Sequence, residues 1–212
     1  MKTGLLLSFG LCIAAGITAW AQTDPASLPA HDAHQGLLVA LNPYLSAERY
    51  KEKFGKRTPY EAGIVALEGF FRNDNDLPLR LDLKTVRLLI GAPGESRQRL
   101  DPLSPEDVAD RVLLKPSKDP SQQRPRIPLP GSVGRGSRRD KNWEELAATV
   151  RSAAMSTDVL PPHGTTHGFF YFDISGRFDW ISNSRFDVPD VVFMLDKKPL
   201  FFFQIDLAPA TH

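Results

Sequence analysis

Cysteine is nearly absent from the sequence, and this limits the chemistry open to the protein. Cys12 is the only cysteine among 212 residues, and it lies in an N-terminal segment that we expect to be removed. The remaining chain then forms no disulfide bond and offers no thiol nucleophile. Cysteine-based zinc sites and iron–sulfur clusters are excluded for the same reason. The roughly 190 residues that follow are enough for one core, which must hold together by packing.

Long apolar runs are also lacking. The run Leu5–Thr18 is too short to cross a bilayer comfortably. It follows a positive start at Lys2 and precedes Ala19 and Ala21, the small residues that a signal peptidase reads. This pattern predicts a secretory signal peptide over residues 1–21.

The signal peptide sets the expected location. The mature chain should begin at Gln22 and be periplasmic or extracellular, with no transmembrane segment after cleavage. A retained membrane anchor is the alternative. A lipoprotein is disfavoured, because Leu11 precedes Cys12 where a small residue would be needed.

Several catalytic and ligand-binding motifs are missing as well. No serine lies in a Gly-x-Ser-x-Gly pattern. Gly131–Gly136 follows no predicted strand and lacks the ending of a phosphate-binding loop. The acids of Asn73–Asp76 lack the glycine and distant glutamate of a calcium loop, and Glu144–Glu145 lies at a helix start, where the dipole explains it. These absences favour a protein without catalytic residues and without a cofactor.

One segment, Lys115–Lys141, concentrates positive charge in a chain whose formal net charge is only +1. It holds eight basic and two acidic residues, with five prolines and three glycines. Proline removes backbone donors and glycine adds backbone entropy, so we expect a disordered basic loop over residues 115–141. The candidate partner-binding residues are those towards its C-terminal end: Arg135, Arg138, Arg139 and Lys141.

An anionic partner would suit this basic loop, either an anionic component of the cell envelope or an acidic protein. Nucleic acid is not expected, because the loop contains no aromatic residue to stack on bases. The alternative is a solvated arm that only keeps the chain soluble, since low hydrophobicity alone accounts for the segment.

The rest of the chain alternates with a period of two, which is typical of strands. Apolar and other residues alternate in this way over Gly63–Asn73 and again over Leu77–Ile90, with turn-forming residues between them. We interpret this pair as a hairpin. The apolar face changes register near Lys84, which predicts a bulge or a strand that crosses between sheets.

Further strands are expected near both ends of the chain. They are an early strand at Leu37–Leu41, a strand at Phe169–Ile174 with a turn at Ser175-Gly176 and a return at Arg177–Ile181, and a hairpin of Asp190–Leu195 with Leu200–Leu207. The last strand is apolar on both sides, so it should lie centrally or have one side against a partner or a helix.

Three helices interrupt this pattern. Ser46–Gly55 has an N-cap serine and a C-cap glycine, and Ser104–Leu114 has a capping serine with proline at its first position. Asn142–Ala154 has a plausible capping box and one apolar stripe, which should cover an open end or face of the sheets. We therefore expect residues 104–156 to be an insertion between two strands.

About seven or eight short antiparallel strands, without alternating helices, predict a mostly β two-sheet sandwich over residues 36–212. Residues 22–35 should be a flexible N-terminal tail. The motif order resembles immunoglobulin-like accessory domains of exported bacterial proteins, through Phe71-Arg72-Asn73 with Asp74 and through Pro161–Gly164 with Gly168–Phe170. This resemblance implies a β-sandwich fold and no active site. The insertion departs from the simple pattern, and the lack of cysteine excludes the bridged immunoglobulin hallmark.

His163 and His167 are the remaining candidates for a metal or catalytic site. On a helix, His163 and His167 would share one face, but the prolines and the glycine around His163 forbid a helix here. On a strand their rings would be about 13 Å apart, too far for one metal ion. A turn could still bring them together, helped by His31 and His34 in the N-terminal tail. The pattern favours a solvated turn and leaves the metal site as the alternative.

Two hypotheses follow for the function. The first is an exported, non-catalytic interaction or accessory domain of the cell envelope. The second is an extracytoplasmic hydrolase or metal-dependent enzyme with a site near His163 and His167, which would need these histidines beside a carboxylate in a concave pocket.

The signal peptide gives the first testable prediction. N-terminal sequencing of the protein recovered after export should start at Gln22, because the small residues of Ala19–Ala21 direct cleavage. Replacing Ala21 by a bulky residue should block cleavage and leave a longer chain on a denaturing gel. A membrane-bound wild-type product that still contains Lys2 would contradict the prediction.

Overall fold

The computed structural model describes residues 24–113, 141–200 and 202–211. It is mostly β, with three antiparallel sheets. The strands are β1 (Ala30–His34), β2 (Leu37–Tyr44), β3 (Ile64–Asn73), β4 (Leu79–Leu81), β5 (Arg87–Ile90), β6 (Gln98–Leu100), β7 (Val159–Leu160), β8 (Thr165–Asp173), β9 (Arg185–Val188), β10 (Val191–Phe193) and β11 (Phe203–Asp206). The helices are α1 (Ala47–Phe54), α2 (Pro105–Leu113) and α3 (Lys141–Ala153), with short 3-10 turns η1 (Pro25–Ser27), η2 (Pro59–Ala62), η4 (Phe178–Asn183) and η5 (Ala208–Thr211).

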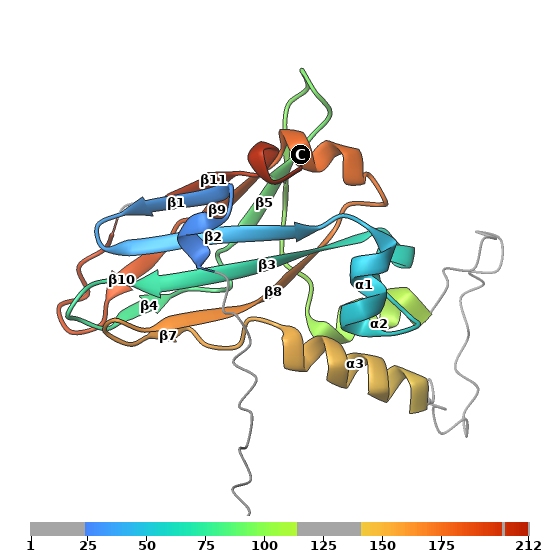
Figure 1. The fold of residues 1–212 in the computed structure, drawn as a ribbon, viewed down its shortest axis with the longest axis horizontal. Helices are drawn as coiled ribbons and strands as arrows, with labels where there is room; N and C mark the ends of the chain where they lie inside the picture. Colours follow the sequence, from blue (N-terminus) through green and yellow to red (C-terminus); the bar gives the residue numbers. More distant parts are fainter. Residues whose placement is uncertain (1–23, 114–140, 201, 212) are drawn as a thin grey trace, which may run out of the picture.

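The sheets form two layers around one apolar core. The strands β1-β2-β3-β8, in that order, make the first layer, which faces the viewer in Figure 1. The second layer consists of the sheets β10-β4-β7 and β11-β9-β5-β6. Inward-facing side chains of both layers meet in a single buried cluster, represented by Val65, Phe172, Leu81, Phe186 and Phe203.

The second layer is divided into two sheets, and the chain passes from one to the other through a turn. A turn at Asp82–Thr85 separates β4 from β5, and the Asp82 side chain accepts a hydrogen bond from the Lys84 backbone N–H at 3.1 Å. Leu81 is buried before this turn and Val86 after it. The predicted register shift near Lys84 is confirmed as a passage from one sheet to the next.

The three helices occur where their capping signals predict them. Ser46 caps α1 and Gly55 ends it, and Ser104 Oγ accepts a hydrogen bond from the Asp107 N–H at the start of α2. The helix α3 begins at Lys141, so Asn142 lies inside the helix and is not its N-cap. All three helices pack against the outer face of the first layer, at the end where β3 begins and β8 ends (Figure 1).

Two buried tyrosines fasten the helices to this sheet. The Tyr50 hydroxyl on α1 accepts a hydrogen bond from Ala66 N–H at 2.7 Å and donates one to the Ile64 carbonyl at 3.1 Å. The Tyr171 hydroxyl on β8 donates to the Val150 carbonyl of α3 at 3.2 Å. Burial raises the pKa of both phenols, so they stay neutral donors at any physiological pH.

The predicted hairpin between residues 63–73 and 77–90 is wrong. The strand β3 pairs with β2 and β8 in the first layer, whereas β4 pairs with β7 and β10 in the second. The chain crosses between layers after Asn73, whose buried side-chain amide donates to the carbonyls of Leu77 and Pro161. The local turn signal was correct, but pairing partners depend on distant strands.

Two further expectations need correction. Part of the expected flexible tail, residues 22–35, is ordered: η1 is followed by β1, which pairs along its whole length with β2. The expected return strand at Arg177–Ile181 is instead the 3-10 helix η4. Both segments are short, and tertiary contacts rather than local propensity decided their conformation.

The C-terminal strand lies at a sheet edge and not at its centre. The expected hairpin of Asp190–Leu195 with Leu200–Leu207 forms only next to its turn. There the Leu200 N–H donates a hydrogen bond to the Val191 carbonyl at 2.8 Å. Beyond it, β11 pairs with β9. Phe203 is fully buried, but Phe202 is 60% exposed, so the Phe202 ring faces solvent.

Among the described residues, no helix has both the length and the apolar character needed to cross a membrane.

The neighbouring phenylalanines of the last strand give a matched test of the core. Phe203→Ala should lower the free energy of unfolding by about 2–5 kcal/mol, because it removes a fully buried ring. Phe202→Ala, the same change at an exposed ring, should change it by less than about 0.5 kcal/mol. Denaturant unfolding curves measure both values, and equal losses would contradict the described orientation of the strand.

Candidate functional site

The sequence-predicted basic residues fall mainly outside the described chain. Arg135, Arg138 and Arg139 lie in the segment that the structure does not describe. Lys141 is the first residue of α3, where its side chain is exposed and its ammonium lies 3.6 Å from the Glu145 carboxylate. Such an exposed pair contributes little to stability, so Lys141 can exchange this contact for one with a partner.

The two candidate histidines lie in different surroundings. His163 occupies the turn before β8 with a positive φ of 53°, and its Nε2 lies 3.0 Å from the exposed Asp76 carboxylate. His167 lies on β8, opposite Phe70 of β3, and its Nδ1 lies 4.0 Å from Glu68. Each histidine therefore has its own carboxylate. No group of three metal-ligating side chains occurs in the described ranges.

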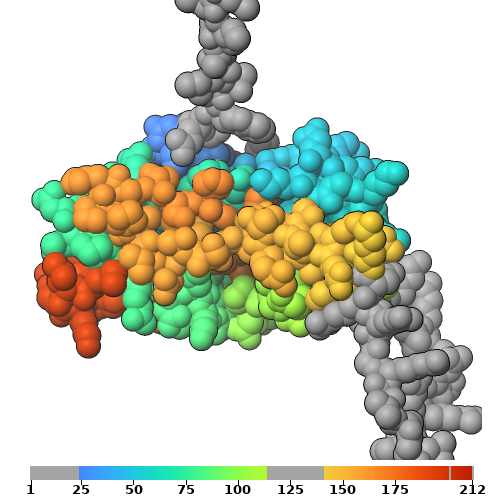
Figure 2. Space-filling view, turned by 90° about the horizontal axis from the view of Figure 1, so that it is seen from below, coloured from blue at the N-terminus to red at the C-terminus, as the bar shows by residue number. Residues whose placement is uncertain are grey.

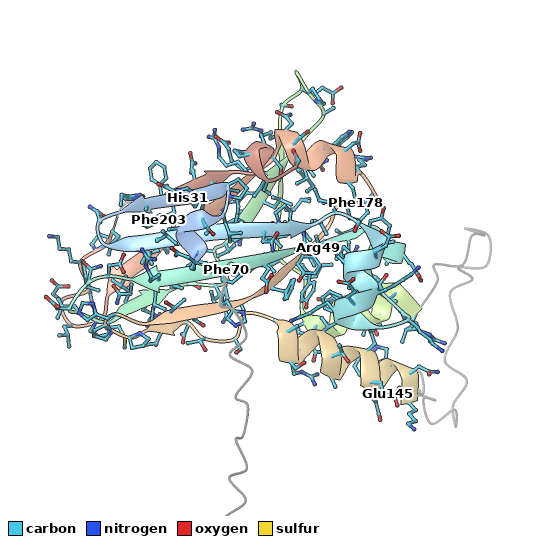
Figure 3. All side chains as sticks on the ribbon, viewed as in Figure 1. His31, Arg49, Phe70, Glu145, Phe178 and Phe203 are labelled. Atoms are coloured by element: carbon cyan, nitrogen blue, oxygen red, sulfur yellow. The ribbon has the colours of Figure 1, made fainter. Side chains whose placement is uncertain are left out.

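The tail histidines are also engaged locally. His31 Nδ1 lies 2.6 Å from the Leu28 carbonyl, and His34 Nδ1 lies 3.3 Å from Asp32. The His34 ring stacks on Phe203 with their centroids 3.8 Å apart, which joins the edges of the two layers. Figure 3 shows His31 and Phe203 on these neighbouring edges.

Glu68, which no sequence motif indicated, lies at the centre of a polar group on the outer face of the first layer. It is opposite Asn42 on β2 and Phe169 on β8, and its side chain is only 14% exposed. The Asn42 amide donates to it at 3.5 Å. Burial, and then the charge of Glu68, raise the pKa of the nearby Tyr44. The sequence signal that could have indicated this residue is that Glu68 is the single acid within the predicted apolar strand Gly63–Asn73.

This polar group borders the helix layer. Arg49 of α1 lies over the Tyr44 ring at 4.1 Å, and Lys53 lies over the Phe169 ring at 5.2 Å. Phe70 stacks on His167 with centroids 5.7 Å apart, and Figure 3 marks Phe70 on the uncovered part of the sheet and Arg49 at its border. The arrangement combines a carboxylate and an imidazole on a surface with aromatic rings. It could exchange protons with a ligand or bind one by hydrogen bonds.

A second feature is a carboxylate without a full set of partners. Asp187 lies on the outward face of β9, between Gln204 of β11 and Arg87 of β5. Its Oδ1 atom is buried and has no hydrogen-bond partner among the described residues. Burial raises the pKa of Asp187, and the opposing effects of Arg185 and Arg99 do not fully offset it. An unsatisfied buried acceptor of this kind needs an explanation, and a ligand donor is one.

A third feature is a cavity of about 410 Å³ where the inserted helices meet the two layers. Its volume is within the range of small-molecule sites. Its wall includes Leu83 and Arg87 of the second layer, Leu103 before α2, Met155 after α3 and Phe169 of β8.

A fourth feature is an apolar end. The large apolar side chains that are exposed in the described chain are Leu77, Met194, Leu195 and Phe202, with exposed fractions of 37%, 42%, 73% and 60%. Met194 N–H donates to the Pro78 carbonyl at 3.0 Å, which holds the β10–β11 connection beside the β3–β4 connection. We call Leu77, Met194 and Leu195 the apolar end. In Figure 2 the red β10–β11 connection protrudes from the end of the molecule opposite the helices.

No protein-family model, no curated protein and no solved structure matches the chain.

The raised pKa of Asp187 predicts a pH-dependent stability. The folded carboxyl keeps its proton to a higher pH than the unfolded one, so the ionised form destabilises the fold once the pH exceeds both values. Asp187→Asn should therefore raise the melting temperature at pH 7, and the gain should shrink below about pH 4, where the unfolded carboxyl is protonated as well.

The exposed Asp190 offers the control for this test. Asp190→Asn makes the same chemical change near the same strand but at a solvated carboxylate, so its melting temperature should follow wild type. Thermal unfolding between pH 3 and pH 8 measures both variants. A lower melting temperature for Asp187→Asn at pH 7 would show that the carboxylate stabilises the fold.

Proposed function

We propose that the protein is an exported, non-catalytic interaction domain of the cell envelope, built on an immunoglobulin-like sandwich. The two-layer arrangement of antiparallel sheets supports this framework, and the N-terminal signal pattern supports export. Domains of this kind present the turns at their ends and the edges of their sheets to partners.

The observation that carries the proposal is the apolar end. Leu195 exposes 73% of its surface and Met194 exposes 42%, although nearly every other large apolar side chain in the described chain is covered. Solvent-exposed apolar groups that gather on one protruding turn mark an interaction site. Their contact with an apolar partner surface would remove them from water and favour association.

The basic segment is a second proposed contact. Residues 115–141 carry eight basic and two acidic residues, whereas the chain as a whole is nearly neutral. The remainder is therefore acidic, and the segment creates a local positive field that suits an anionic envelope component or an acidic protein. Arg135, Arg138 and Arg139 would make this contact together with Lys141, the first residue of α3.

An extracytoplasmic hydrolase is the second candidate function, and the 4.0 Å separation of His167 and Glu68 favours it. A carboxylate beside an imidazole is the usual arrangement of a general base and the group that orients it. Neither residue lines the cavity of about 410 Å³. A screen of ester, amide and phosphate substrates tests this candidate, since activity lost in His167→Ala would establish it.

The interaction proposal predicts that two surfaces respond differently to salt. Wild type should sediment with an envelope fraction, and Met194→Glu/Leu195→Glu should reduce the bound fraction severalfold at every salt concentration, because the contact is apolar. Arg138→Glu/Arg139→Glu should reduce binding mainly at low salt, because surface charges are screened over about 8 Å at physiological ionic strength.

A control for charge is available on the far side of the fold. Ser182→Glu adds a negative charge at an exposed position of η4 without touching either surface, and it should bind as wild type does. Melting curves confirm that each variant is folded. Wild-type binding by the Met194→Glu/Leu195→Glu variant would remove the apolar end from the mechanism.

A further inference from the structure

The 410 Å³ cavity lies at the seam between the inserted helices and the sandwich. On one side are the β4–β5 turn and β5, and on the other are the segment that enters α2 and the segment that leaves α3. Its floor is the edge of β8. Figure 2 views the molecule from the side on which the α3–β7 connection, in gold, meets the green second layer.

Backbone hydrogen bonds to β8 hold two walls of the cavity in place. Met155 N–H donates to the Phe169 carbonyl at 3.0 Å, and Leu103 N–H donates to the Tyr171 carbonyl at 2.8 Å. Gly168 allows this close approach, because a Cβ atom there would lie 2.6 Å from the Met155 backbone. The walls are therefore fixed by the fold and are not the result of loose packing.

The buried part of the cavity wall is mainly apolar. Met155 is 9% exposed, and Phe169, Phe170 and Tyr171 are exposed by 5% or less. Leu83 and Leu103 are partly buried against the two apolar clusters and also line the cavity. An apolar group that enters this space gains the free energy of leaving water.

The mouth of the cavity carries one uncompensated positive charge. Arg87 Nε lies 2.6 Å from the Asp101 carboxylate, and its Nη1 donates to the Val86 carbonyl at 2.6 Å. The charge of this guanidinium is therefore paired with that of Asp101. Lys84 is exposed at the rim, and no ion pair of its ammonium occurs within the described ranges. The local charge at the mouth is therefore that of Lys84.

We propose that this cavity binds a small amphipathic acid, with an apolar body against Leu83, Leu103 and Met155 and a single anionic group beside Lys84. The volume suits a drug-sized or short acyl ligand. A cationic amphiphile would place its charge beside the Lys84 ammonium, and a neutral one would leave that charge without a partner. This site is separate from the apolar end and does not depend on the proposed function.

Three probes of equal chain length test the charge at the mouth. Isothermal titration of the full chain with decanoate should give saturable one-to-one binding below the micelle concentration. Decanol should bind about two- to fivefold more weakly, which is the factor expected for losing one exposed charge pair, and decyltrimethylammonium should bind more weakly still. Octanoate should lose about fourfold for each methylene that the cavity no longer covers.

Variants locate the binding to this cavity. Lys84→Glu should weaken decanoate severalfold and bring decanoate below decanol in affinity, whereas Lys56→Glu, the same charge change at an exposed lysine outside the cavity, should leave it unchanged. Leu83→Gln should weaken decanoate and decanol alike, because it makes the apolar wall polar. Melting curves identify any variant that fails to fold.

Two outcomes would overturn the proposal. One is equal affinity for decanoate and decyltrimethylammonium, which would show that Lys84 does not select the charge of the ligand. The other is equal decanoate affinity in Lys84→Glu, Lys56→Glu and wild type, which would place any binding elsewhere. Neither result depends on envelope association, so the two proposals fail separately.

Discussion

Burial of the first sheet on both faces is the constraint on which the rest of the structure depends. Antiparallel sheets commonly leave one face to water, and β3 follows that rule only over its second half. Its first four residues, 64–67, are buried in succession, and burial then alternates from Glu68 onward. The strand β8 shows the reverse order, with continuous burial over residues 168–172. Inner side chains meet the second layer, and outer side chains meet the helices.

The candidate surfaces follow from this incomplete covering. The polar group around Glu68 and His167 lies where the helix layer stops and the sheet face opens to solvent. The cavity lies where the segments flanking α2 and α3 pass the edge of β8. The apolar end lies at the opposite end of the strands (Figure 2), where none of the described helices covers the turns. The limited extent of the helical layer therefore accounts for the positions of all three features.

Apolar packing, and not charge pairing, holds this fold together. Ion pairs such as those of Arg185 with Asp206 and of Arg72 with Asp24 each join a partly exposed arginine to an exposed carboxylate. Exposed pairs of this kind each contribute about 0–1 kcal/mol, whereas one buried phenylalanine contributes several times as much. The exposed ammonium of Lys84 is therefore available for binding with little loss of stability.

Local sequence determined the elements that depend on neighbouring residues. The serine and glycine at the ends of α1 and the apolar stripe of α3 predicted helices, because a cap and a helical face involve residues within a few positions of each other. The register change near Lys84 could be predicted as well, because it appears in the alternation of neighbouring residues in β4 and β5. The mostly β class followed from many short alternating segments.

Only the tertiary structure decided which strands pair and which side chains meet. The alternation of apolar and other residues over 63–73 predicts that β3 is a strand. It does not indicate that β3 pairs with β2 and β8 rather than with β4. The contact of His167 with Glu68 joins residues 99 positions apart, and the cavity wall brings Leu83 beside Met155. Such contacts depend on the closure of long chain segments, whose cost is almost independent of local sequence, so they are fixed by the packing of whole layers.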